Sequence, residues 1–155
     1  MPKRPTYRAA VYVIPVRGRE ILLSQRFNTG FGDGWYSFVA GHVEEGESST
    51  QTAVRESLEE AGIGIVQSDL RYVHTLHRFT DDGLVYFDLF FTAESWQGTP
   101  SVMEPHRCSE MRWAAFDALP EKTLPYIRHV VAQVFVDGLI TDRPNLLVAL
   151  EQKQE

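Results

Sequence analysis

Three glutamates near the end of one predicted helix could bind a divalent cation. Glu56, Glu59 and Glu60 fall within an arc of about 100° on a helix expected over residues 48–61. Carboxylates at these spacings repel each other by about 0.2–0.5 kcal/mol a pair, and the last helical turn disfavours each anion by about 0.3–1 kcal/mol. Only Arg55, one turn before Glu59, offers local compensation. This placement is unfavourable for stability alone, and a bound cation would explain it.

The type of ligand favours one class of metal. Carboxylate oxygens are hard ligands and no Cys/His set accompanies them, so the pattern indicates Mg²⁺ or Mn²⁺ rather than zinc. The alternative interpretation is an acidic helix face in contact with solvent, which is the ordinary case for a run of charges. The wider sequence has to decide between these two interpretations.

The ends of this helix can be recognised in the sequence. Ser48, followed three residues later by Gln51, is a capping-box pattern, and Gly62 can adopt the left-handed conformation that ends a helix. We expect the hydroxyl of Ser57 to bond the carbonyl oxygen of Ala53. One face is expected to pack on a sheet, and it consists of Val54, Ser57, Leu58 and Ala61. The three glutamates are expected on roughly the other side of the helix.

The rest of the chain combines strands with one further helix. Strands are expected at residues 9–16, 20–26, 35–39, 69–79, 84–93 and 111–116, and a glycine-rich loop at 27–34. A second helix is expected from about 123 to 137, with Gly138 as its stop. The tail from about residue 143 is expected to form a short helix or a frayed end. This mixture indicates an α+β fold.

Length and composition restrict the class of protein. With 155 residues, 43% hydrophobic and 23% charged, the chain is expected to fold as a single domain over residues 1–155. Its net charge of −6 argues against a bulk electrostatic grip on nucleic acid. No apolar run approaches the ~20 residues that a membrane span needs, and no signal peptide is recognisable. Because Cys108 is the only cysteine, we expect a cytoplasmic protein without internal disulfides.

Residues 41–63 resemble the sequence box of the Nudix hydrolases, G-x5-E-x7-R-E-U-x-E-E-x-G-U, in which U is aliphatic. Every fixed position is matched, by Gly41, Glu47, Arg55, Glu56, Glu59, Glu60 and Gly62. A match of this kind arises by accident on the order of once in 10⁹ starting positions. The chain departs from the pattern at Ser57, which should be aliphatic, and at Val39-Ala40-Gly41-His42, where many members have Pro-Gly-Gly.

The resemblance implies a fold and a metal site. Members of this family form an α/β/α sandwich around a mixed sheet and hydrolyse a diphosphate linked to another group, with Mg²⁺ or Mn²⁺. In this chain Arg55 would orient the glutamates by salt bridging, and Glu47 would brace the loop and help to hold Arg55. The metals would be held by Glu56, Glu59, Glu60 and a backbone carbonyl near Ala40.

The general base differs among members of the family. One candidate is a glutamate of the box, Glu59 or Glu56. The other is an acid on the loop that enters the last predicted strand, Glu104 or Glu110. For Glu104 the alternative is an ordinary exposed loop acid.

Three residues outside the glutamate cluster are candidates for binding substrate. Arg26 matches a position that often faces substrate in the family, and its guanidinium suits phosphate, with a surface salt bridge as the alternative. Phe31 lies in the glycine-rich loop, where it could stack on a nucleobase for about 1–3 kcal/mol. His42 could touch phosphate or substrate, and the alternative is a structural or exposed histidine.

The leading hypothesis is a MutT-like enzyme that hydrolyses a nucleoside triphosphate to the monophosphate and pyrophosphate. The second is cleavage of ADP-ribose or a nucleotide sugar, and the third is a nucleotide-binding module without turnover. The complete glutamate set argues against the third. The expected partner is a small nucleotide, and neither nucleic acid nor a membrane is expected. Nudix proteins are often dimers, so a homodimer stays open, although no residue here identifies an interface.

Overall fold

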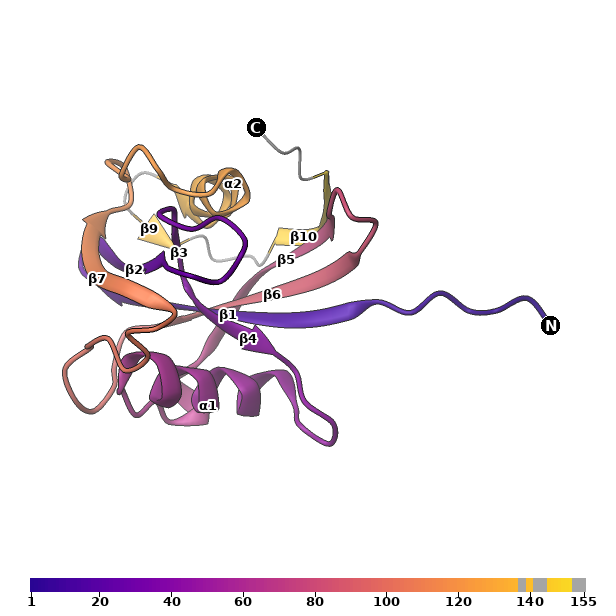
Figure 1. Cartoon of the computed structure of the whole chain (residues 1–155). Helices are drawn as coiled ribbons and strands as arrows, with labels where there is room; N and C mark the ends of the chain where they lie inside the picture. The colour runs from indigo at the N-terminus through magenta and orange to yellow at the C-terminus, as the bar shows by residue number, and fades with distance from the viewer. Residues whose placement is uncertain (137–138, 141–144, 152–155) are drawn as a thin grey trace.

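A mixed β-sheet lies at the centre of the protein, with one helix on each of its faces (Figure 1). The structure is a computed structural model and describes residues 1–136, 139–140 and 145–151. Its helices are α1 Ser49–Ala61, the short 3-10 helix η1 Gln67–Asp69 and α2 Pro125–Val134. Its strands are β1 Arg8–Arg17, β2 Glu20–Arg26, β3 Tyr36–Ser37, β4 Val39–His42, β5 Arg71–Phe79, β6 Val85–Ala93, β7 Cys108–Ala115, β8 Phe135–Val136, β9 Leu139–Ile140 and β10 Asn145–Glu151. The α+β sandwich that the sequence predicted is therefore confirmed.

The sheet topology brings three distant segments together. The main strand order is β10-β5-β6-β1-β2-β3, while β4 pairs with β1 and β7 pairs with β2. The β1–β6 and β5–β10 pairs are parallel, and the other pairs of this sheet are antiparallel. In the β2–β7 pair, Arg26 lies opposite Cys108. The end of β2, the start of β7 and β4 thereby border one region, in which the candidate site lies.

Strand β1 is apolar on both faces because it contributes to two separate cores. Tyr12 and Ile14 belong to the cluster beneath α2. Val11 and Val13, which alternate with them, belong to the cluster beneath α1. Successive strand residues point to opposite sides of a sheet, so a strand covered by a helix on each side needs an unbroken apolar run.

The tail differs from its prediction. Strand β10 pairs in parallel with β5 over Asn145–Glu151, so the expected short helix or frayed end is wrong for these residues. Its backbone groups find their partners on the edge of β5, which the local sequence does not reveal. The predicted stop of the second helix, Gly138, lies outside the described residues, and α2 ends at Val134.

The strand predicted at 35–39 is two short strands, β3 and β4, interrupted at Phe38. Within the described ranges, no helix has the length and apolar character needed to cross a membrane.

A buried histidine joins the sheet to α2. The His74 side chain on β5 is fully buried, and its ring centroid is 6.3 Å from that of His129 on α2. Neither ring nitrogen of His74 has a hydrogen-bond partner in the structure. Burial, and after it the neighbouring His129, lowers the pKa of His74 to about 4. The neutral imidazole is thus the form that fits between β5 and α2.

We expect the protein to lose stability as the pH falls from about 6.5 to about 4. In this window an unfolded His74 binds a proton while the folded one does not, so acid favours unfolding, by up to about 3 kcal/mol. His74→Phe removes the titrating group and is expected to flatten this part of the pH profile. Thermal unfolding between these pH values measures the effect, with the exposed His106→Gln as control. An unchanged slope in His74→Phe would contradict it.

Candidate active site

Helix α1 begins and ends where the sequence predicts. The Ser48 side chain accepts a hydrogen bond from the backbone of Gln51, whose side chain in turn bonds the Ser48 backbone. Gly62 caps the other end in the left-handed conformation, with φ of 68°. The Ser57 hydroxyl donates to the Ala53 carbonyl oxygen at 2.7 Å, as expected for a small polar residue at an aliphatic position.

The face that α1 presents to the sheet differs from the predicted one. Leu58 was expected to pack inward, yet it is 59% exposed. Glu56 was expected on the opposite side from the packing face, yet it is buried, with 9% exposure. The helix is rotated so that small residues and a carboxylate, rather than its large apolar residue, contact the sheet. The buried residues of α1 are Thr52, Ala53, Glu56, Ser57 and Ala61.

Gly41 on β4 makes room for the Glu56 carboxylate. A Cβ at position 41 would lie 1.8 Å from Oε1 of Glu56, well inside van der Waals contact. Any side chain here would therefore displace the carboxylate from the groove between β4 and α1. The motif therefore requires glycine at position 41 for a steric reason, and not because of the backbone conformation there.

Arg55 connects the acidic residues of the box. Its guanidinium donates to both carboxylate oxygens of Glu47, at 2.8 and 3.0 Å, and to Oε1 of Glu56 at 2.7 Å. It also reaches Oε2 of Glu59 at 3.2 Å and the carbonyl oxygen of His42 at 3.1 Å. The hydrogen bonds that Glu47 accepts from Arg55, and after them the one from the Thr52 hydroxyl, lower the pKa of Glu47 to about 2. The contacts that the motif implied for Arg55 and Glu47 are thus present.

Positive charge compensates two carboxyl groups of the site only in part. Glu60 accepts one hydrogen bond, from the Ala40 amide at 3.2 Å. Burial, and after it the negative charge of Glu56, raises the pKa of Glu60 to about 8. Burial also raises the pKa of Glu56, although the contact with Arg55 opposes it. The site therefore holds more acidic side chains than its one bonded guanidinium neutralises.

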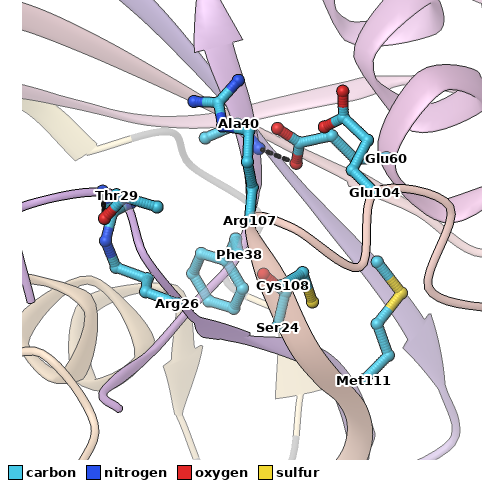
Figure 2. A pocket seen from close by; sticks show the side chains of 10 residues that line it. All are labelled: Ser24, Arg26, Thr29, Phe38, Ala40, Glu60, Glu104, Arg107, Cys108 and Met111. Carbon is cyan, nitrogen blue, oxygen red and sulfur yellow. Dashed lines mark hydrogen bonds between the residues drawn. The ribbon is translucent and has the colours of Figure 1, made fainter. Parts of the chain in front are cut away.

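Two adjoining cavities open beside these acids. The smaller, about 70 Å³, is shown in Figure 2. It is lined by Ser24, Arg26, Thr29, Phe38, Ala40, Glu60, Glu104, Arg107, Cys108 and Met111. The larger, about 440 Å³, extends across the sheet face beneath α2 to the turn between β5 and β6, and this volume is in the range of small-molecule sites. Arg26, Ala40 and Arg107 line both cavities, so the two adjoin at these residues.

The predicted substrate contacts are brought together in the larger cavity. Arg26, Phe31 and His42 all line it. The Arg26 guanidinium donates to the Phe31 carbonyl oxygen at 2.7 Å and lies 5.3 Å from the Phe31 ring centroid, so it orders the glycine-rich loop. The exposed His42 stacks on Tyr86 at 5.8 Å between ring centroids.

The structure separates the two loop acids. Glu104 lines the smaller cavity, and Figure 2 shows its carboxylate beside that of Glu60. Glu110 instead accepts a hydrogen bond from the Tyr36 hydroxyl and lines neither cavity. Among Glu56, Glu59 and Glu60, Glu59 is the most exposed, with its side chain 53% exposed and bonded to Arg55. In the described part of the chain, no three acidic, histidine or cysteine side chains already converge as a metal cage.

Sequence reasoning missed several residues of this site. Arg107 and Cys108 line the smaller cavity, while Arg78, Tyr86 and Tyr126 line the larger one. They come from β5, β6, α2, the loop before β7 and the first residue of β7, and no spacing pattern connects them. The sequence offered one weak indication of these residues: alternation along β6 places Tyr86 and Asp88, two polar side chains, on the same side of the strand.

Residues 6–134 match the family model described as the NUDIX domain. The chain belongs to the Nudix family. It is 33% identical over 142 residues to the NAD-capped RNA hydrolase NudC of Stutzerimonas stutzeri, a match that covers 90% of this chain and 46% of that protein. With NudC of Pseudomonas aeruginosa it shares 34% over 116 residues, 75% of this chain and 39% of the relative. The chain therefore spans less than half the length of these curated relatives.

Solved structures show the same fold. A MutT Nudix hydrolase from Burkholderia pseudomallei, 25% identical, superposes with a TM-score of 0.78 over 84% of this chain and 99% of its own. A Nudix hydrolase from Nitrosomonas europaea, 18% identical, superposes with a TM-score of 0.72 over 97% of this chain and 82% of its own. At its lower identity, the second likeness concerns the fold alone.

Gly41→Ala is expected to expel the Glu56 carboxylate from its groove while the fold survives, because a flexible side chain can move aside. Affinity for Mn²⁺ should fall about tenfold or more, with a Tm within about 3 °C of wild type. Calorimetric titration and thermal unfolding measure the two effects. Gly64→Ala is the matched control, since its Cβ would make ordinary contact with Gln97 at 3.8 Å. Unchanged affinity in Gly41→Ala would overturn the steric explanation.

Glu60→Gln is expected to stabilise the metal-free protein, increasingly so from about pH 4.5 to about pH 8. The pKa of folded Glu60, about 8, lies above the ordinary 4.5, so this carboxyl stabilises the fold below pH 4.5 and loses that contribution as the pH rises through 8. Glutamine never acquires the charge. The difference in Tm between variant and wild type, with chelator, gives the profile. Glu45→Gln, an exposed box neighbour, should give a flat line, and a flat line for Glu60→Gln would refute the argument.

Proposed function

We propose that this protein hydrolyses the phosphoanhydride bond of a nucleoside diphosphate linked to a further group, with Mg²⁺ or Mn²⁺. The observation that carries the proposal is the incompletely neutralised pair of buried Glu56 and half-buried Glu60. Glu60 lines the smaller cavity, which adjoins the one of about 440 Å³. Strongly perturbed carboxyl groups in a cleft are typical of functional sites rather than of stabilising ion pairs.

The residues present suit a hard divalent cation. Glu56, Glu59 and Glu60, with the backbone carbonyl of Ala40, would hold it, and carboxylates raised in pKa by burial gain most from a nearby positive charge. Magnesium takes few protein carboxylates and keeps waters and substrate phosphates, so no closed cage is needed. When bound, the cation would polarise the phosphates and lower the pKa of a coordinated water.

The protein groups would orient the reaction. Arg55, fixed by Glu47, holds Glu56 and Glu59 in place, and the Ala40 amide holds Glu60. A carboxylate beside the water would accept its proton, and the candidates are Glu56, Glu59 or, across the smaller cavity, Glu104. The larger cavity, with Phe31 and His42 on its walls, would take the nucleoside.

Two substrate classes follow from this site. We favour a nucleoside triphosphate, cleaved to monophosphate and pyrophosphate, because a nucleoside suits the larger cavity and the structurally similar Burkholderia protein is a MutT hydrolase. The second candidate is a dinucleotide or nucleotide sugar, such as NAD or ADP-ribose. It is supported by the relatives named NAD-capped RNA hydrolase, although this chain spans less than half of their length.

Glu60→Gln is expected to reduce Mg²⁺-dependent hydrolysis at least ~100-fold without unfolding the protein, since it removes a charged ligand. A panel of nucleoside triphosphates, NAD and ADP-ribose, scored for pyrophosphate or mononucleotide release, measures turnover and separates the substrate classes. Glu45→Gln is the control. Wild-type protein without turnover on the whole panel would support the binding module instead, and full activity in Glu60→Gln would refute the assigned metal ligands.

A further inference from the structure

Arg107 lies where the two cavities join. It is one of the residues that line both, and it ends the loop that leads into β7. Figure 2 shows its side chain beside Ala40, whose amide bonds the Glu60 carboxylate. Burial and the Glu56 charge raise the pKa of Glu60, and the positive charge of Arg107 opposes them, which agrees with this proximity.

The arginines of the site differ in what their side chains bond. Arg26 donates to the Phe31 carbonyl oxygen at 2.7 Å and to the Thr29 hydroxyl at 3.0 Å. Arg78 donates to buried Asp88 at 2.5 Å and is itself buried. The Arg107 side chain makes no hydrogen bond or ion pair of normal length with any residue that the structure describes. Its donors are therefore available to a ligand.

The backbone around Arg107 is held on three sides. Its amide donates to the Glu104 carbonyl oxygen at 2.9 Å, and its carbonyl oxygen accepts from the Phe27 amide at 3.0 Å. The Met103 amide donates to the Glu60 carbonyl oxygen at 3.2 Å, which ties the same loop to the end of α1. The fold thus fixes the Arg107 backbone between the end of α1 and the glycine-rich loop, so its side chain starts from a defined place beside the site.

We propose that Arg107 binds the substrate phosphate on the larger-cavity side of the glutamates, through two parallel N–H···O bonds. This inference rests on the proposed function. Glu60 and Glu104 line the smaller cavity and the nucleoside would occupy the larger, so a linked diphosphate that reaches Glu60 has to pass the junction at Arg107. A planar fork of donors matches two oxygens of one phosphate. In a ligand whose first phosphate lies at the glutamates, Arg107 would then hold the second phosphate, a contact that a ligand with one phosphate bound there does not make.

The test compares binding of one and two phosphate groups without turnover. Methylenediphosphonate, whose bridging carbon prevents hydrolysis, and methylphosphonate are titrated calorimetrically in Mg²⁺ buffer into wild type, Arg107→Gln and Arg107→Lys. The matched control is Arg112→Gln on β7, whose side chain lies over Tyr36 and lines neither cavity. The Mg²⁺ affinity of each variant is measured separately.

We expect Arg107→Gln to weaken methylenediphosphonate binding about tenfold or more and methylphosphonate binding by less than about threefold. Arg107→Lys should fall between wild type and Arg107→Gln, because an ammonium keeps the charge but loses the fork. Arg112→Gln should bind like wild type, and Mg²⁺ affinity should be unchanged throughout.

Four results would overturn the proposal: equal losses for both ligands, affinity of Arg107→Gln within twofold of wild type, a matching loss of Mg²⁺ affinity, or wild type that binds no methylenediphosphonate at millimolar concentration. Equal losses would show a structural role, and a loss of Mg²⁺ affinity would show that Arg107 only balances the acids. Failure of the proposed function is distinguishable, since it appears as absent hydrolysis by wild type in the substrate panel.

Discussion

Partial or complete desolvation of two carboxyl groups, half-buried Glu60 and buried Glu56, against strand β4 is the constraint on which this site depends. Glu56 enters a groove that exists because Gly41 has no side chain, and Glu60 is held by a single backbone amide. Arg55 neutralises only part of this charge, since it also bonds Glu47 and Glu59. Desolvated charge of one sign is unfavourable in a folded protein, and its presence beside a cavity supports the proposal that a cation completes the site.

The sheet topology explains why this charge faces a usable cavity. Strand β1 is paired on one side with β4, which borders the acids, and on the other with β6, which carries Tyr86 to the larger cavity. The antiparallel β2–β7 pair brings Arg26 opposite Cys108, so the glycine-rich loop and the loop of Glu104 meet at the same edge. Acids, cations and aromatic rings from distant segments thereby surround the two adjoining cavities.

Local pattern predicted the parts of the structure that short-range forces control. The span of α1, its capping box, the Gly62 cap and the Ser57 hydroxyl bond follow from neighbours within four residues, and all are observed. The pattern was wrong about Leu58 and Glu56, because amphipathicity assumes that large apolar residues face inward. Here the groove beside Gly41 accepts a carboxylate instead. The prediction for the tail was wrong for a related reason, because strand β10 forms through its pairing with the distant strand β5.

The sequence by itself determined the family, the acidic motif and the network that orients it, because these depend on residue types at fixed spacing along one helix and its leading loop. Tertiary structure alone decided which glutamates are desolvated, which of the two loop acids borders the site, and that Arg107 stands at the junction of the cavities. The physical reason is that desolvation and charge proximity depend on distances through space, and strand pairing and helix rotation set those distances between segments far apart in the chain.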